Sequence, residues 1–432
     1  MSIAIFWFRR DLRLNDNKAF FRALKSSGKV LPLFIFDDVI LDTLPQNDHR
    51  VEFIHSTLSV IDQVLRKQGS GILVKKGRPI SVFSRLLEEF DIEAVHSNAD
   101  HEPYGRERDQ KVGALLASRG IGFFQELDHL VLTAHDALKP DGKPYNVFTP
   151  YSRRWKEVLE HRASAEFPSE SLLQNCFKGQ VDRFPALEEI GFKPSGMAMP
   201  IATIDRDLIK NYHETRNFPA VNGVSLLSPH LRFGTISIRK LVKLAQGLNE
   251  TFLNELIWRE FYAMILHHFP RVVNESFRPE YDRIVWLNNK EEFERWKQGR
   301  TGFPMVDAGM RQLSATGYMH NRLRMVTASF LTKHLLIDWR WGQAWFADKL
   351  FDFELSSNNG GWQWSAGTGT DAAPYFRIFN PVEQQKKFDP EEKYIRQWIA
   401  EYGTNTYPAP IIDLKIARER CLAAYKKAIR GY

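Results

Sequence analysis

The sequence has few cysteines and no long apolar run, and each absence excludes a class of protein. Only Cys176 and Cys421 occur among the 432 residues, so the disulfide framework of small secreted domains is excluded. No run of about 18 apolar residues is present, so no membrane span is expected. The opening residues, MSIAIFWFRRDLRLND, lack the basic start and cleavage site of a signal peptide. These absences predict a cytoplasmic protein with no membrane partner.

Several catalytic and nucleotide-binding motifs are also missing. No G-x-G-x-x-G follows the first apolar run, where the residues from Arg9 to Arg13 stand instead, so an ordinary dinucleotide crevice is not supported in this half. Neither a nucleophile elbow nor a P-loop is found. The His267-His268 pair has no matching set of Cys, His or Asp, so we predict no metal site.

Length and composition indicate a globular protein of two or three domains. The chain has 432 residues, of which 43% are hydrophobic and 26% charged. Its net charge of +7 permits a nucleic-acid partner, although many basic proteins bind none.

Strand-like and helix-like segments alternate over the first 130 residues. Alternation of this kind predicts an α/β domain with a doubly wound parallel sheet and helices on both faces. The predicted strands are 3–8, 30–37, 72–76, 92–97 and 122–127, and the predicted helices are 50–68, 81–90 and 105–118.

The rest of the chain divides into a connector and a helical domain. Residues 131–200 are rich in Pro and Ser with little sustained period, which indicates the connector. From 201 to 432 the pattern is helical. The predicted helices there are 202–212, 238–245, 251–268, 290–298, 305–315, 320–336, 341–350 and 390–402.

Nine of the 11 tryptophans follow residue 250, and several stand among cations, amides and glycines. Core packing is one explanation for them. Indoles in such company also form surfaces that stack on a flat ring, carry an electron and face phosphates.

Two predicted helices carry unusual polar faces. In 251–268, a carboxylate, an indole, a guanidinium and a phenol share one face at spacings of three and four residues: Glu255, Trp258, Arg259 and Tyr262. In 320–336, an amide and a thioether point the same way, and two arginines beside them are suited to phosphates: Asn321, Met325, Arg322 and Arg324. The alternative for 251–268 is an amphipathic helix whose charged side meets water, and for 320–336 it is a helix N-terminus with ordinary charges.

Two further segments complete the candidates. Asn358-Asn-Gly-Gly361 permits a close backbone approach to a ring system, with Asp352 and Glu354 placed to accept hydrogen bonds, although such a run can also be a plain turn. Ser225 and Ser228 before an apolar period suit a phosphate or a simple helix N-cap.

Long stretches of the chain resemble the photolyase/cryptochrome family, and within it the class I cyclobutane pyrimidine dimer photolyases. The stretches are FWFRRDLRLNDN (6–17), FTPYSRRW (148–155), SLLSPHLRFGTIS (225–237), LNELIWREFY (253–262), TGFPMVDAGMRQL (301–313), GYMHNRLRMVTASFLTKHLLIDW (317–339) and NNGGWQWSAGTGTDAAPYFRIFNP (358–381). The resemblance implies light-driven repair of pyrimidine dimers in UV-damaged DNA, a carbon–carbon lyase reaction, by a monomer that binds FAD in its helical domain.

The resemblance also implies roles for individual residues. FAD would contact Tyr212, Val224, Ser225, Leu226, Leu227, Ser228, Arg259, Asn321, Arg324, Asp352, Glu354 and Asn358. The flipped lesion would meet Glu255, Trp258, Asn321, Met325 and Trp364, and DNA would further contact Arg216, Tyr262, Arg322, Arg377 and Gln384. Electrons would travel from the surface to the flavin through Trp286, Trp339 and Trp362.

Some positions depart from the family pattern. Val224 stands where many members have Thr, and Glu354 stands where Asp is frequent. The segment from His101 to Asp109 lacks the Asn-Glu pair that holds a folate in some relatives, which disfavours a folate antenna held in that way. A deazaflavin, another flavin or no antenna chromophore remains open.

Two other functions in the family compete with dimer repair. A cryptochrome-type light sensor would share the fold and FAD, but the residue that matches the family's position beside the reactive flavin nitrogen is Asn358, as in photolyases. A (6-4) photoproduct photolyase expects a second histidine near the lesion, where this chain has Asn321 and Met325.

Overall fold

Five apolar segments of the N-terminal half form one parallel sheet. They are β1 (Ile3–Phe8), β2 (Val30–Phe36), β3 (Leu73–Lys76), β4 (Ile92–Asn98) and β5 (Gly122–Glu126), in the order β3-β2-β1-β4-β5. Every neighbouring pair is parallel. β1 is central and buried along its whole length, as expected for a strand covered on both faces.

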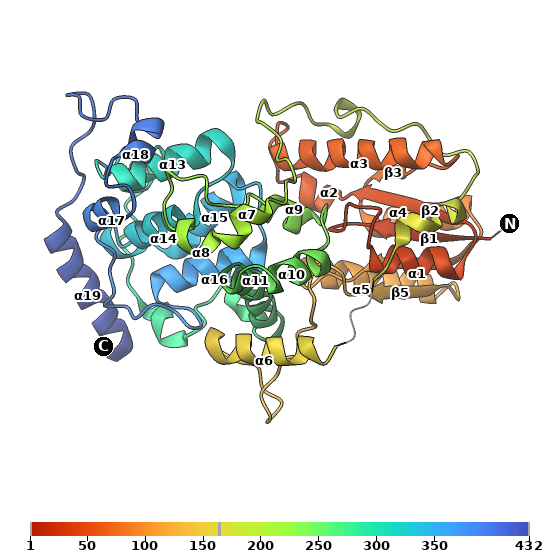
Figure 1. Cartoon of the computed structure of the whole chain (residues 1–432), viewed down its shortest axis with the longest axis horizontal. Helices are drawn as coiled ribbons and strands as arrows, with labels where there is room; N and C mark the ends of the chain where they lie inside the picture. The colour runs from red at the N-terminus through yellow and green to blue at the C-terminus, as the bar shows by residue number, and fades with distance from the viewer. Residues whose placement is uncertain (1, 163–165, 431–432) are drawn as a thin grey trace. The chain divides into compact units, whose positions relative to one another are not determined.

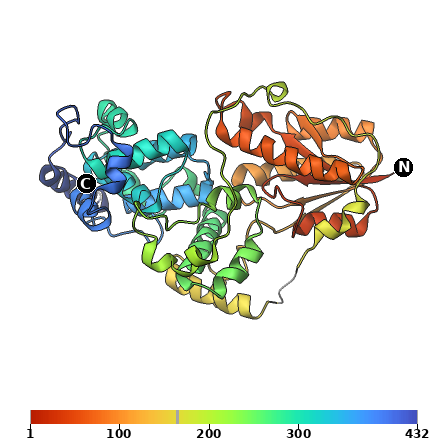
Figure 2. The ribbon, with the colours of Figure 1, turned by 45° about the horizontal axis from the view of Figure 1, so that its top comes forward.

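The computed structural model describes residues 2–162 and 166–430, and these residues divide into two units (Figure 1). Unit 1 comprises Met1–Asp136, Glu157–Thr203 and Leu226–Leu244, and unit 2 comprises Ala137–Lys156, Ile204–Ser225 and Ala245–Tyr432. The chain therefore passes between the units several times, and Figure 2 shows the same ribbon turned by 45°.

Unit 1 is the predicted doubly wound domain. Its helices are α1 (Lys18–Ser26), α2 (Asp38–Leu41), α3 (His49–Lys67), α4 (Pro79–Glu89), α5 (Pro103–Ala117), α9 (Ser228–Phe233) and most of α10 (Ile238–Gln246), with 3-10 turns at Ser169–Asn175 and Glu188–Ile190. On one face of the sheet, Trp7 packs edge-on against Phe83 of α4, and on the other face Phe6 and Phe8 pack on Phe20 of α1. The predicted fold class is confirmed.

Distant segments of unit 1 are joined by a buried ionic network. The Arg239 guanidinium on α10 pairs with Asp16 at 2.9 Å and with Asp128 at 2.8 Å. Beside it, Gly234 ends α9 with φ +65, and a Cβ there would lie 2.1 Å from the Arg10 carbonyl oxygen. Only glycine fits both the backbone angle and the space.

Unit 2 is helical. It holds most of α6 (Phe148–Glu160), then α7 (Arg206–Lys210), α8 (Tyr212–Thr215), α11 (Glu250–His268), α12 (Lys290–Lys297), α13 (Pro304–Thr316), α14 (Asn321–Ser329), α15 (Trp339–Lys349), α16 (Leu355–Ala366), α17 (Pro381–Phe388), α18 (Lys393–Trp398) and α19 (Leu414–Arg430). Single turns occur at Pro270–Val273, Pro279–Arg283 and Phe330–His334. Its core includes the buried indoles Trp296, Trp339 and Trp362.

Helices α6 and α16 have no counterpart among the predicted helices. The Asn-Asn-Gly-Gly run, for which a plain turn was the alternative, lies inside α16, so that alternative was wrong. Helix α6 lies within the predicted connector, and its Trp155 donates a hydrogen bond from its indole N–H to the buried Glu260 carboxylate at 2.7 Å. In α16, tertiary packing outweighs the weak helix propensity of Asn and Gly.

Candidate functional site

Helix α11 presents the polar face that the spacing predicts. The Asn249 side chain caps it by accepting from the Phe252 N–H, and Leu256, Ile257 and Phe261 are buried. On the opposite stripe the four predicted side chains are neither buried nor fully exposed: Glu255, Trp258, Arg259 and Tyr262. This face of α11 is therefore not a fully solvated one.

Trp258 is held by an aromatic partner that sequence reasoning missed. The Phe148 ring lies flat on the indole, with ring centroids 3.8 Å apart and planes at 4°. Phe148 itself is fixed because its N–H donates to the Asp371 carboxylate at 3.1 Å. One face of the Trp258 indole is thus covered and its orientation is set. The only signal was the position of Phe148 at the start of the FTPYSRRW motif.

Glu255 and Arg216 form an ion pair beside this indole. The guanidinium donates to the carboxylate at 2.6 Å, with both side chains about a quarter to a third exposed. Arg216 also lies over the Tyr212 ring at 5.4 Å. Burial raises the pKa of Glu255, and Arg216 opposes that rise. Two residues with separately predicted roles therefore act on each other.

Helix α14 begins with a histidine cap. His320 Nδ1 accepts from the Arg322 N–H at 3.1 Å, and burial followed by the nearby Arg322, Arg324 and Arg216 lowers the pKa of His320 to about 4. Asn321 at the first position of the helix is exposed, while Met325 one turn later is half-buried. The histidine is thus a neutral cap near neutral pH.

The two predicted arginines of α14 have different partners. Arg322 donates to the Asn217 side-chain oxygen at 2.6 Å and lies over the Phe388 ring at 4.2 Å. Arg324 makes a two-pronged pair with Asp352, at 2.8 and 3.2 Å. Two N–H groups on one carboxylate fix the guanidinium plane.

Helix α16 brings its glycines against a ring. Glu354 caps the helix by accepting from the Ser357 N–H at 3.1 Å and the Ser357 hydroxyl at 2.6 Å. A Cβ on Gly360 would lie 2.1 Å from the Tyr262 ring, whereas one on Gly361 would meet nothing within 4 Å. Gly360 therefore lies closely against Tyr262 of α11, and the expected approach to a bound ring system stays a prediction. Asn358 donates to the Gln343 carbonyl at 3.1 Å.

The three predicted electron carriers lie in unit 2 but do not stack on one another. Trp362 and Trp339 are buried, and neither indole N–H has a hydrogen-bond partner among the described residues. Trp362 instead lies edge-on to the indole of Trp296, with the ring centroids 6.1 Å apart. Trp286 packs edge-on against Tyr425 at 6.1 Å. Within the described residues, no ring contact joins two of the three.

The remaining predicted residues are more scattered. Val224 and Ser225 belong to unit 2, whereas Leu226, Leu227 and Ser228 belong to unit 1. Neither serine caps α9, whose N-cap is Leu227 without a side-chain bond, so the N-cap alternative was wrong. Leu226 has the left-handed φ of +53. Trp364 is half-buried and 6.4 Å from Phe379, Arg377 is exposed, and the buried Gln384 Oε1 has no partner among the described residues.

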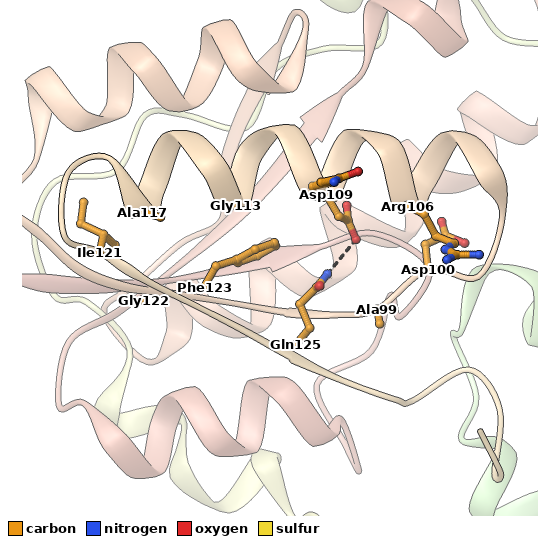
Figure 3. A pocket seen from close by; sticks show the side chains of 11 residues that line it. Ala99, Asp100, Arg106, Asp109, Gly113, Ala117, Ile121, Gly122, Phe123 and Gln125 are labelled. Atoms are coloured by element: carbon orange, nitrogen blue, oxygen red, sulfur yellow. Dashed lines mark hydrogen bonds between the residues drawn. The ribbon is translucent and has the colours of Figure 1, made fainter. Parts of the chain in front are cut away.

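Unit 1 carries a hollow of about 830 Å³ between α5 and β5. Figure 3 shows Phe123 and Gln125 of β5 pointing into the space beside the helix, with Gln125 donating to Asp109 at 2.7 Å. The hollow begins at Asp100, just after β4. Burial alone would raise the pKa of Asp100, but Arg10 and the neighbouring histidines lower it well below its usual range.

Polar pairs fill the space on the other side of Asp100. Arg10 donates to Asp100 at 3.1 Å and to Glu102 at 2.9 Å, and the Tyr104 hydroxyl donates to Asp37 at 2.5 Å. These groups follow the carboxyl ends of β1, β2 and β4, where open α/β sheets place their ligands.

Comparison with known proteins decides the family. The family model "DNA photolyase" matches residues 4–170, and "FAD binding domain of DNA photolyase" matches 252–406. A deoxyribodipyrimidine photo-lyase of Synechococcus sp. is 36% identical over 98% of this chain and 96% of its own length. The chain belongs to the DNA photolyase family. The prediction of a photo-lyase enzyme with an FAD-binding domain is confirmed at this level.

Two solved photolyase structures are similar to this chain over nearly its whole length. A class III photolyase from Agrobacterium tumefaciens has a TM-score of 0.88 and 32% identity, covering 100% of this chain and 98% of its own. An archaeal photolyase from Sulfolobus tokodaii, described with two FAD molecules, has a TM-score of 0.80 and 34% identity, covering 99% and 100%. The first points to a subclass other than the expected class I, and the second to photolyases with a second chromophore.

In residues 2–162 and 166–430, no helix combines the length and apolar character that a bilayer crossing needs.

Proposed function

We propose that this photolyase repairs cyclobutane pyrimidine dimers in DNA by light-driven electron transfer from reduced FAD to a flipped-out lesion. The observation that carries the proposal is the α11 face, where the Phe148-backed indole of Trp258 stands beside the Arg216–Glu255 pair. A flat apolar ring next to a carboxylate matches a pyrimidine, which offers a π-face and an imide N–H.

The residues of unit 2 fit a bound flavin dinucleotide. Open space lies over the Gly361 backbone, and the indole N–H of buried Trp362 has no partner among the described residues. Arg324, fixed by Asp352, and half-buried Arg259 would supply positive charge to the cofactor. When bound, FAD supplies the light absorption and the one-electron chemistry.

The protein's own groups would bind and orient the lesion. Extracting a dimer from the duplex costs a few kcal/mol, less than for a well-stacked pair. Trp258 and Trp364 would stack on the bases, Glu255 would bond the imide edge, and Asn321 with Met325 would contact the lesion from α14. Arg216, Arg322, Arg377 and Gln384 would hold the flanking DNA backbone, since phosphate contacts position the strand without reading its sequence.

Blue-light assays on defined lesions test this function. Chemically reduced protein should restore thymines in dimer-containing oligonucleotides and leave (6-4) photoproducts unchanged, because His320, the histidine nearest Asn321 in sequence, is committed to capping α14. Trp258→Ala should lose lesion binding more than undamaged-DNA binding. Tight FAD binding without repair in the reduced protein would refute the proposal in favour of a light sensor.

We further propose that the hollow along α5 and β5 receives the second, light-harvesting chromophore. It starts at the carboxyl end of β4, and its lining combines the Phe123 ring with the polar Asp109 and Gln125. A deazaflavin or a second flavin is the chemical class that we expect, with a folate disfavoured.

Filling the hollow tests that location. Ala117→Trp adds a ring to the lining, and Ala114→Trp adds the same ring to an exposed position of α5 outside it. We expect only the first to abolish the extra absorbance acquired on loading with deazaflavin or FAD. Equal loading of both variants would place the chromophore elsewhere.

A further inference from the structure

Trp286 lies between two apolar side chains that point into solvent. Val285 is 73% exposed and Leu287 is 51% exposed, whereas Ile284 is buried. The segment is pinned, since the Leu287 N–H donates to the Leu336 carbonyl at 2.8 Å. The Asp338 N–H donates to the Asn288 side chain at 2.9 Å. The two apolar side chains are thus held outward on a fixed backbone.

The segment packs against α19, a strongly basic helix. Its sequence, LKIARERCLAAYKKAIR, has six Lys or Arg and one Glu. Trp286 meets Tyr425 of this helix, and Arg283 donates to the Ala428 carbonyl at 2.9 Å. Near this contact Ile429 is 40% exposed.

Most of the charge on α19 is uncompensated. Within the described part of the chain, five of its exposed cations have no ion-pair partner, namely Lys415, Arg418, Lys426, Lys427 and Arg430. Favourable interaction with the helix C-terminus explains cations in the last turn only. It explains neither those of the earlier turns nor the exposed apolar side chains.

We propose that this Trp286 surface, made of Val285, Leu287, Ile429, Lys426, Lys427 and Arg430, docks an acidic one-electron carrier protein. Small apolar contacts with a charged rim suit transient redox encounters, which bury little area and rely on electrostatic steering. The inference rests on the electron path that the family resemblance implies, in which Trp286 is the outer end.

In the encounter, one electron would pass from the carrier protein to the oxidised Trp286 indole. After light has drawn one electron inward from Trp286 to the bound flavin, the carrier gives one electron to the oxidised indole and is itself oxidised by one electron. If the indole has released its N–H proton to water, it takes one proton back. The surface therefore returns Trp286 to its starting state and leaves the net electron on the flavin.

DNA is the competing partner for a basic face. Phosphates need cations but gain nothing from exposed Val285 and Leu287. In both views α19 lies at the outer edge of unit 2, away from α8 and α11, which carry the proposed lesion site (Figure 1, Figure 2). Of the proposed DNA contacts, Arg377 lies in a segment that reaches α19, because the Tyr375 ring stacks on Tyr425. These observations favour an acidic protein.

The test compares two charge-reversal variants of the flavin-loaded protein. Lys426→Glu/Lys427→Glu changes the proposed surface, and Lys25→Glu/Lys67→Glu reverses two exposed lysines of unit 1. The probe is a reduced plant-type [2Fe–2S] ferredoxin, which is acidic, with reduced cytochrome c as a basic comparison. Flash spectroscopy follows the decay of the Trp286 radical, and anisotropy of labelled ferredoxin gives its dissociation constant in the dark.

We expect ferredoxin to accelerate the decay, with a rate that falls as salt rises. The α19 variant should lower that rate and the dark affinity about tenfold, while the unit 1 variant leaves both unchanged. Cytochrome c should have no such effect. Equal rates in both variants, or loss of DNA affinity alone in the α19 variant, would overturn the proposal.

A small thiol reductant separates this proposal from the electron path on which it rests. If thiol supports photoreduction through Trp286 but ferredoxin does not accelerate the radical decay, the docking surface is wrong and the electron chain stands. If Trp286→Phe leaves thiol-supported photoreduction intact, the electron chain itself is wrong.

Discussion

Removing the ring behind Trp258 should weaken lesion binding selectively. In Phe148→Ala the indole loses a partner that lies flat on it at 3.8 Å and keeps only its tilted and edge contacts with Tyr262 and Phe261. A stacked aromatic pair contributes about 0.5–1.5 kcal/mol beyond buried area. Ordering a freed side chain on binding costs a similar amount.

If the lost stacking energy or the cost of ordering the indole weakens the complex, the binding free energy for dimer-containing DNA should fall by about 0.5–1.5 kcal/mol, which is roughly 2- to 13-fold in affinity. Undamaged DNA should bind as before, because Phe148 carries no charge. Anisotropy titrations with matched damaged and undamaged duplexes measure both affinities.

Two control variants test whether the stacked ring is responsible. Phe148→Tyr keeps the ring and should bind lesions normally. Phe124→Ala removes a phenylalanine of unit 1 that is 54% exposed, and it should also leave lesion affinity unchanged. An equal loss of both affinities in Phe148→Ala, or no loss of either, would refute the role assigned to the stack.

Three further predictions concern charge and electron flow. Arg216→Gln should raise the pKa of Glu255 further, because burial raises this pKa and the guanidinium lowers it. Glu255 should then take up its proton at a higher pH than in wild type. In titrations between pH 5 and 8, lesion affinity should therefore be lost at a higher pH in the variant as the solution is acidified. Trp286→Phe or Trp362→Phe should stop photoreduction of oxidised FAD while repair by chemically reduced protein continues, and unchanged photoreduction in both would show another electron route. Burial lowers the pKa of Lys333 to about 8, so between pH 8 and 10.5 this side chain by itself favours the folded state increasingly, by up to about 3 kcal/mol, because in the unfolded chain it still holds its proton. Burial raises the pKa values of the Cys176 and Cys421 thiols, which act in the opposite direction over this range. In urea unfolding, Lys333→Met should therefore lose stability relative to wild type as the pH rises from 8 to 10.5, and a constant difference between the two proteins would refute the assignment.

The sheet was predictable because its strands are continuous apolar runs separated by helices. The predicted strand 3–8 is β1 itself, and the others differ from the structure by one residue at an end. Helix α16 was missed because Asn-Asn-Gly-Gly has low helix propensity. The helix is supported by contacts that no local pattern shows, such as Gly360 against Tyr262 and the Asn359 amide on the Val272 carbonyl at 2.8 Å.

The candidate site was predictable where its residues share one helix. The α11 face follows from spacing alone. Pairings across the chain do not: Phe148 stacks on a residue 110 positions away, and Arg216 bonds one 39 positions away. The strongly helical α19 was missed although Ala417, Cys421 and Tyr425 repeat every four residues, which is a pattern that the sequence displays.

The Arg216–Glu255 ion pair has a consequence for how damage is told from intact DNA. One guanidinium cannot serve a backbone phosphate and its own carboxylate equally well, so in the proposed complex the phosphate competes for Arg216 and loosens its hold on Glu255. The carboxylate then needs a new donor, which the imide of an extruded pyrimidine supplies and a base left in the stack does not. Binding of the DNA backbone by Arg216 and recognition of the base by Glu255 thereby become cooperative. Intact DNA, whose base stays in the stack, loosens the Arg216–Glu255 ion pair without gaining the hydrogen bond from the imide to Glu255.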